Sequence, residues 1–182
     1  MYFLAITFCY AQENSAGEKE FKNAINIGFV GIQTTSLSIN YERLMGGNNG
    51  IVIGMPILNF YDSKERGLSL NYRRHFRGAM SSGFWGIFAN YSLVENEVES
   101  TNESVKTEYK FSIKSFAIGP DIGFRWVDKS GINLALRIGY GIPFSYFTWK
   151  NEPTDKDLAD DARFAFKIIS GFDAELTLGY CF

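Results

Sequence analysis

The residues of this sequence that could do chemistry are eight ionisable side chains spread among alternating apolar and polar segments. They are four acids, three arginines and the single histidine: Glu42, Arg73, His75, Asp121, Arg125, Arg137, Asp173 and Glu175. In an extended strand these positions would all share the face opposite the apolar side chains. Buried charges are costly unless they are paired, so the near balance of signs predicts a salt-bridge network. The expected pairs are Glu42 with Arg73, and Asp121, Asp173 or Glu175 with Arg125 and Arg137.

Two other kinds of chemistry are compatible with this set. In a water-filled passage for small ions, Arg73 or Arg137 would set the ion preference. Catalysis would depend on His75, the only histidine, because a serine nucleophile needs a histidine base and a carboxylate to orient it. A lone histidine is usually structural, so we expect no enzymatic activity.

Neither a metal nor a cofactor is expected. One histidine and one mature cysteine, Cys181, cannot supply the ligands of a zinc site. The aspartates at 155, 157, 160 and 161 lack the glycine and the terminal glutamate of a calcium-binding loop. A solvated acidic loop is the simpler interpretation.

Composition narrows the class of protein. The net charge of -2 provides no basic stripe for nucleic acid. A mean hydropathy of -0.10 argues against membrane-spanning helices, although alternating strands of a membrane barrel also average to near zero. Aromatic residues make up 16%, with 18 glycines and only 4 prolines, a mixture that suits many strands joined by tight turns.

The chain reads as eight strand-like segments with no convincing helix. They are Asn23–Ile32, Thr35–Leu44, Ile51–Phe60, Gly67–Arg77, Phe84–Val94, Phe111–Val127, Ile132–Thr148 and Ser170–Phe182. Pro56 lacks an N–H donor and predicts a local bulge or kink in the third segment. Two long polar loops are expected, at Glu95–Lys110 and Lys150–Ala162.

Alternation alone does not say which face lies inside, since a soluble barrel of the lipocalin kind would enclose the apolar one. Aromatic residues gather at the segment ends, which is typical of the interfacial girdles of a membrane barrel. One girdle would contain Tyr41, Phe76, Trp85, Trp126, Tyr180 and Phe182, and the other Phe60, Tyr91 and Tyr146. The fold predicted is therefore all-β: an eight-stranded antiparallel up-and-down transmembrane β-barrel, with the charges inside and the two long loops extracellular.

The N-terminal segment predicts export. Residues 1–11 are apolar and end in Cys9-Tyr10-Ala11, with small residues at the two positions that signal peptidase prefers. We expect a signal peptide over 1–11, whose start is truncated or misassigned, then a flexible lead over 12–22 and the barrel over 23–182. The alternative for residues 1–11 is an apolar N-terminal strand.

A family resemblance covers the barrel region. The run Leu70-Asn71-Tyr72-Arg73-Arg74-His75-Phe76, the run Ile118 to Trp126 and Leu136-Arg137-Ile138-Gly139-Tyr140-Gly141 resemble the outer-membrane protein A-like β-barrel superfamily, in its uncharacterised small-barrel branch. The closing segment resembles the last strand of such barrels, which carries the signal read by the barrel-assembly machinery. Carried over to this chain, that signal consists of Leu176, Leu178, Tyr180 and Phe182.

The resemblance implies a location and partners. It implies a monomer in the outer membrane of a Gram-negative bacterium, in contact with outer-membrane lipid, lipopolysaccharide and the barrel-assembly machinery. The expected role is structural or surface-interactive, through the two long loops. The alternatives are a narrow, porin-like channel and, third, a lipid A-modifying enzyme; the His-x-Ser pattern of lipid A deacylases is absent after His75.

Overall fold

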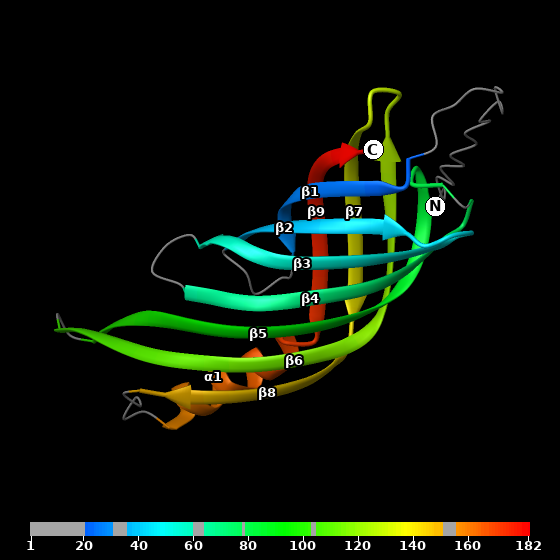
Figure 1. Ribbon diagram of the computed structural model, residues 1–182. Helices are drawn as coiled ribbons and strands as arrows, with labels where there is room; N and C mark the ends of the chain where they lie inside the picture. Colours follow the sequence, from blue (N-terminus) through cyan, green and yellow to red (C-terminus); the bar gives the residue numbers. More distant parts are fainter. Residues whose placement is uncertain (1–20, 31–35, 60–63, 78, 103–104, 151–155) are drawn as a thin grey trace, which may run out of the picture.

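The computed structural model describes residues 21–30, 36–59, 64–77, 79–102, 105–150 and 156–182. Within these ranges the chain forms nine strands and one helix, drawn in Figure 1. The elements are β1 (Asn23–Val30), β2 (Ser36–Leu44), β3 (Asn49–Asn59), β4 (Lys64–His75), β5 (Ser82–Asn102), β6 (Val105–Val127), β7 (Ile132–Tyr140), β8 (Ile142–Trp149), α1 (Lys156–Ile169) and β9 (Phe172–Cys181).

All strands belong to one antiparallel sheet that closes on itself. Strands β1 to β6 pair successively, β7 pairs with both β6 and β9, and β9 pairs back onto β1. Strands β7 and β8 both pair with β6, and β8 continues the register of β7 beyond Gly141. The two therefore act as one interrupted strand of the barrel wall. The result is the closed eight-stranded antiparallel barrel that the segment pattern predicts.

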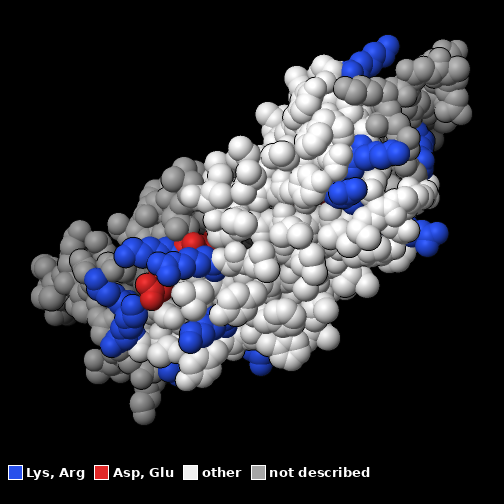
Figure 2. All heavy atoms as spheres, in the orientation of Figure 1, with Lys and Arg blue, Asp and Glu red and all other residues white. Residues whose placement is uncertain are grey.

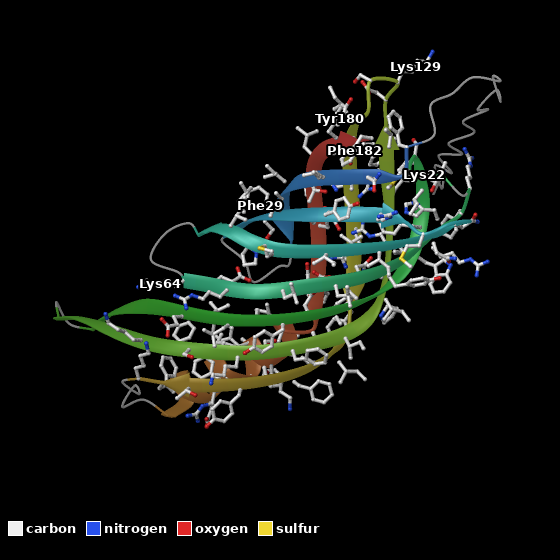
Figure 3. All side chains as sticks on the ribbon, in the orientation of Figure 1. Lys22, Phe29, Lys64, Lys129, Tyr180 and Phe182 are labelled. Carbon is white, nitrogen blue, oxygen red and sulfur yellow. The ribbon has the colours of Figure 1, made fainter. Side chains whose placement is uncertain are left out.

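The predicted division of the two faces is confirmed. On β7 the side chains of Leu134, Leu136 and Ile138 are 38%, 39% and 56% exposed, whereas Arg137 between them is 6% exposed. Figure 3 shows Phe29 and Tyr180 on the outside of the barrel, and each is 49% exposed. The apolar face is therefore the outer surface, and the charged face is the interior.

The predicted loop over Glu95–Lys110 is wrong. Strands β5 and β6 form one long hairpin whose register runs unbroken from Ser82 opposite Arg125 to Asn102 opposite Val105. Polar residues do not prevent a ladder, because the strand-to-strand hydrogen bonds are made by the backbone. The lack of apolar alternation in this stretch concealed the strands.

The predicted loop over Lys150–Ala162, and the absence of a helix, are also wrong. Helix α1 occupies Lys156–Ile169 and packs against β8. Isolated helices of this length are marginal, and most of their stability in proteins comes from tertiary packing. That packing comes from Phe166, whose ring lies 5.3 Å from that of Phe111 and 5.5 Å from that of Phe147. No helix in the described part of the chain is long and apolar enough to cross a membrane.

The expectation at Pro56 is confirmed. Leu37 pairs with Leu58 but Ser38 pairs with Pro56, which leaves Ile57 as an extra residue on β3. The predicted signal peptide and most of the lead fall in residues 1–20, outside the described ranges. Within the lead, Lys22 belongs to the wall, since its carbonyl accepts from the Leu44 N–H at 2.8 Å.

Candidate functional site

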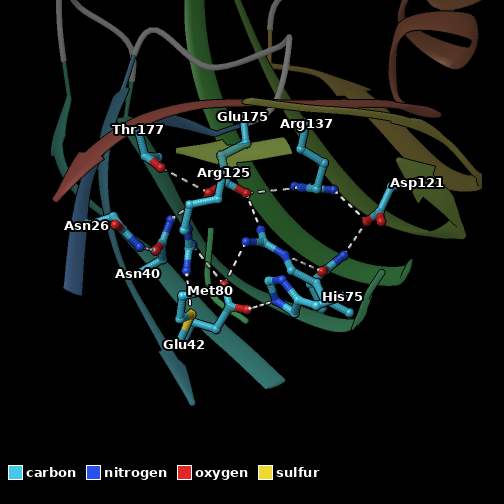
Figure 4. A network of polar contacts seen from close by, with 12 residues as sticks. Asn26, Asn40, Glu42, His75, Met80, Asp121, Arg125, Arg137, Glu175 and Thr177 are labelled. Carbon is cyan, nitrogen blue, oxygen red and sulfur yellow. Dashed lines mark hydrogen bonds and ion pairs between the residues drawn. The ribbon is translucent and has the colours of Figure 1, made fainter. Parts of the chain in front are cut away.

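The candidate site is the network of buried charges that crosses the barrel interior, shown in Figure 4. All eight predicted residues lie there, and none is more than 6% exposed. They come from five strands, β2, β4, β6, β7 and β9, because each occupies an inward position of its strand's alternation. The predicted set is thus brought together in one interior.

Glu42 of β2 is the acceptor at one end of this network. Its Oε2 lies 2.8 Å from Arg73 Nη1 and 2.7 Å from Arg125 Nη2, and its Oε1 lies 2.8 Å from His75 Nε2. The predicted pair Glu42–Arg73 is therefore present. Three basic groups around one fully buried carboxylate compensate the cost of burying it.

Arg73 connects Glu42 to the rest of the network. Its Nη2 bonds the Glu175 carboxylate, and its Nε donates to Asn71 Oδ1 at 2.8 Å. The guanidinium also lies over the Phe84 ring, 4.5 Å from the centroid, as a cation–π contact. The Arg73 guanidinium therefore has two carboxylate partners and also packs against an aromatic ring.

Arg137 holds the other end of the network. Its Nη1 lies 2.9 Å from Asp121 Oδ2 and 2.5 Å from Asp173 Oδ2, and its Nε lies 3.1 Å from Glu175 Oε2. The Asn71 amide bonds the same Asp121 carboxylate. The prediction that Arg137 pairs with Asp121, Asp173 or Glu175 is therefore confirmed, and Arg137 in fact pairs with all three acids.

Arg125 departs from the prediction. It was expected to pair with Asp121, Asp173 or Glu175, but its ion pair in the structure is with Glu42. Arg125 follows Asp121 by four residues along β6, toward the turn after Val127, and this places it at the height of Glu42. Sequence alternation gives the face of a residue but not its height in the barrel, so it could not choose the partner.

Inward glycines make room for the large interior side chains. A Cβ at Gly123 would lie 2.4 Å from the Phe84 ring, and one at Gly86 would lie 2.5 Å from Asp121 Oδ1. An interior of this size holds little more than its own side chains. The charges are therefore packed among rings and small residues.

Sequence reasoning missed Ser82. His75 Nδ1 lies 3.1 Å from Ser82 Oγ while His75 Nε2 faces Glu42, so a serine, a histidine and a carboxylate stand in the order of a hydrolase triad. The Ser82 hydroxyl, however, donates to the Ala79 carbonyl at 2.9 Å, which directs its proton away from His75. All three side chains are also at most 2% exposed, so no substrate can reach them in this conformation.

Three further polar residues of the interior, Asn26, Asn40 and Thr177, were not among the predicted site residues. Asn26 Nδ2 donates to Asn40 Oδ1 at 2.7 Å, Asn40 Nδ2 lies 3.3 Å from Glu175 Oε1, and the Thr177 hydroxyl donates to that same oxygen at 3.0 Å. These residues alternate in phase with the charges, which was the signal that could have identified them.

The predicted girdle and closing-strand residues lie on the outer surface. Those described are 39–70% exposed, namely Tyr41, Phe76, Trp85, Tyr91, Trp126, Tyr146, Leu176, Leu178, Tyr180 and Phe182, while Phe60 falls outside the described residues. Their position on the outside is established, and their roles in the membrane and in assembly stay predictions. In the part of the chain that is described, no group of three or more His, Cys, Asp or Glu side chains could hold a metal.

Comparison with known proteins does not identify a family for this chain. The sequence matches no protein-family model, and no characterised protein matches it at a significant level. The resemblance to the outer-membrane protein A-like superfamily accordingly stays a prediction.

Proposed function

We propose that this protein is an outer-membrane β-barrel with a structural or surface-interaction role and a closed, non-conducting interior. The observation that supports the proposal is the inverted distribution of side chains. Charged and amide side chains lie in the interior among rings and small residues, while large apolar and aromatic side chains lie on the outside of every strand from β1 to β9. Water-soluble monomers rarely expose apolar patches of more than a few hundred Å².

The outer surface has the layout of a bilayer-spanning wall. Figure 2 shows a broad white band free of blue and red, with basic side chains gathered at both ends. In hydrocarbon every backbone polar group needs a partner, and a closed barrel provides it. On this basis the aromatic residues near the band's edges would lie at the membrane interfaces, as Trp85 and Trp126 would at the end that carries the C-terminus.

A structural role is favoured over a channel because the network crosses the lumen. Glu42, Arg73, Glu175 and Arg137 form a continuous series of ion pairs between opposite walls. The apolar cluster of Val94, Phe111 and Ile113, with Phe166 of α1 packed on it, lies on strands β5 and β6 toward the α1 end. An ion would have to displace the charged network to cross the lumen.

The test has two steps. The full chain is refolded into phospholipid vesicles, and insertion is measured by heat-modifiable gel mobility. Single-channel recording in planar bilayers should then give a flat trace for the wild type, whereas the double variant Glu42→Ser/Arg73→Ser, which removes two of the four residues in this series of ion pairs, should conduct. A conducting wild type would favour the channel, and a chain that never inserts would refute the membrane barrel.

The enzyme alternative has its own test. Expression of the wild type and of His75→Ala in a Gram-negative host should leave the same lipid A composition by mass spectrometry. A lipid A species present only with the wild type would assign catalysis to the Ser82–His75–Glu42 arrangement.

A further inference from the structure

Basic side chains gather on the outer surface near the end that carries α1. Figure 2 shows them as one of its two blue groups, and Figure 3 marks Lys64 at the start of β4. Lys64, Arg66 and Lys114 are exposed, and among the described residues none of the three has an ion-pair partner. The acid in their midst, Glu95, is bridged to Lys150 at 3.4 Å.

The sheet register places these cations directly beyond an apolar row. One row across β4, β5, β6 and β8 is made entirely of exposed apolar or aromatic side chains, namely Leu68, Tyr91, Phe116 and Phe144. The next row toward α1 alternates cations with an apolar and an aromatic residue, in the order Arg66, Leu93, Lys114 and Tyr146.

The spacing of the cations suits a phosphorylated headgroup. Arg66 and Lys114 are two strands apart, about 10 Å, and Lys64 lies one pleat beyond Arg66, about 7 Å along β4. Guanidinium and ammonium groups offer only hydrogen-bond donors, and phosphate oxygens are their strongest acceptors. Two or three donors can therefore converge on one or two phosphates.

We propose that these three cations, which we call the cationic cluster (Lys64, Arg66 and Lys114), bind the phosphate-bearing headgroup of a membrane lipid, with the acyl chains lying along the apolar row. The inference rests on the proposed membrane location. It specifies a lipid and not a soluble anion, because the cations point outward at the edge of the apolar band, where acyl chains end.

The opposite end of the barrel provides the matched comparison. Three of its exposed cations, Arg43, Arg74 and Arg77, do not share a row in this way. Arg74 lies in register between Asn49 and Trp85, and Arg43 lies beside Ile51. An isolated cation attracts an anionic lipid but cannot hold a phosphate from two sides.

The experiment measures lipid selectivity at the barrel surface. The full chain is inserted in phosphatidylcholine vesicles, and electron spin resonance gives the association of spin-labelled phosphatidic acid relative to spin-labelled phosphatidylcholine. The wild type should prefer phosphatidic acid. Lys64→Gln/Arg66→Gln/Lys114→Gln should lower that preference by about five-fold or more, the factor expected for one basic residue beside an anionic surface.

Two further triple variants separate the effect of charge from the effect of position on the barrel. Lys64→Arg/Arg66→Lys/Lys114→Arg keeps the charges and should keep the preference. Arg43→Gln/Arg74→Gln/Arg77→Gln removes as many charges at the opposite end and should keep most of it. If the neutral triple does not insert, Lys114→Gln alone should give a partial loss.

Competition identifies the source of the phosphate. Diphosphorylated lipid A that displaces the label at lower concentration than phosphatidylglycerol indicates a glycolipid, and the reverse order indicates a phospholipid; both support the proposal. Displacement by inorganic phosphate as effective as by lipid would overturn it. So would an inserted neutral triple with unchanged preference, or an equal loss in the opposite-end triple. A wild type that does not insert would refute the membrane location itself, and the inference with it.

Discussion

Arg137 of β7 lies directly opposite Glu175 of β9, and its Nε atom is 3.1 Å from Oε2 of that carboxylate. The same guanidinium also faces Asp121 and Asp173, so one cation compensates three buried acids. This cross-strand pair joins two neighbouring strands of the wall and one end of the interior network.

Replacement of Arg137 by Met should therefore destabilise the barrel strongly. Removing one partner of a buried ion pair costs about 3–5 kcal/mol, because the remaining charges stay buried without compensation. The free energy of unfolding in urea, measured on the refolded protein by tryptophan fluorescence, gives the value. Arg137→Lys should fall between, since it keeps the charge but loses the planar fork of donors.

The matched control for that change is Arg74→Met. Arg74 is exposed on the outer face of β4, and a surface substitution of this kind changes stability by about 0.5 kcal/mol at most. Equal losses at the two positions would show that the interior network does not stabilise the barrel.

Helix α1 offers a second pair of substitutions, two residues apart. Phe166 packs on the rings of Phe111 and Phe147, whereas Phe164 is 67% exposed. Phe166→Ala should weaken the attachment of α1 to β8 by about 1–3 kcal/mol, below the range for a fully buried ring because Phe166 is only half-buried. Phe164→Ala should leave that attachment nearly unchanged.

Amide hydrogen exchange in α1 measures this effect directly. Phe166→Ala should speed exchange in the helix while the amides of β7 and β9 keep their protection, because local opening requires less free energy than unfolding the barrel. Uniform loss of protection over the whole chain would contradict a helix that is attached locally.

The turn between β6 and β7 should make stability depend on pH. Hydrogen bonds from the Ser130 hydroxyl at 2.7 Å and from the backbone N–H groups of Ile132 and Ser130, both at 2.9 Å, lower the pKa of the Asp128 carboxyl below its ordinary value. The pKa in the folded state is lower than in the unfolded chain. The contribution of Asp128 is therefore present above the unfolded pKa and is lost as pH falls through the folded pKa.

Asp128→Asn isolates that contribution. At neutral pH the variant should have a lower urea midpoint than the wild type, and the two midpoints should converge as the solution is acidified through the carboxyl titration. A difference that persists unchanged in acid would mean that the charge of Asp128 is not its source. Ser130→Ala should produce part of the same shift, since it removes the hydroxyl donor.

The alternation of apolar and polar residues in the sequence was sufficient to predict most of the barrel wall, apart from the outer half of the β5–β6 hairpin. Period-two patterns in segments such as Ile132–Thr148 predicted the strands, their order and which side chains face inward, because a strand assigns faces by parity alone. The same rule identified all eight charged or titratable members of the interior network, but the polar residues that join them were not predicted. The bulge at Pro56 could also be predicted, since a missing N–H is a local property.

Only the tertiary structure decided which side chains pair across the interior and which segments predicted as loops are strand or helix. Arg125 pairs with Glu42 because the stagger between strands sets which side chains share a height, and no local pattern contains that stagger. Ser82 joins His75 for the same reason. Residues 105–110 are strand because β5 pairs with them through backbone hydrogen bonds, and Lys156–Ile169 is a helix because the inner face of β8 provides an apolar surface for Phe166. In each case the deciding free energy comes from contacts between residues distant in sequence, which parity along one segment does not record.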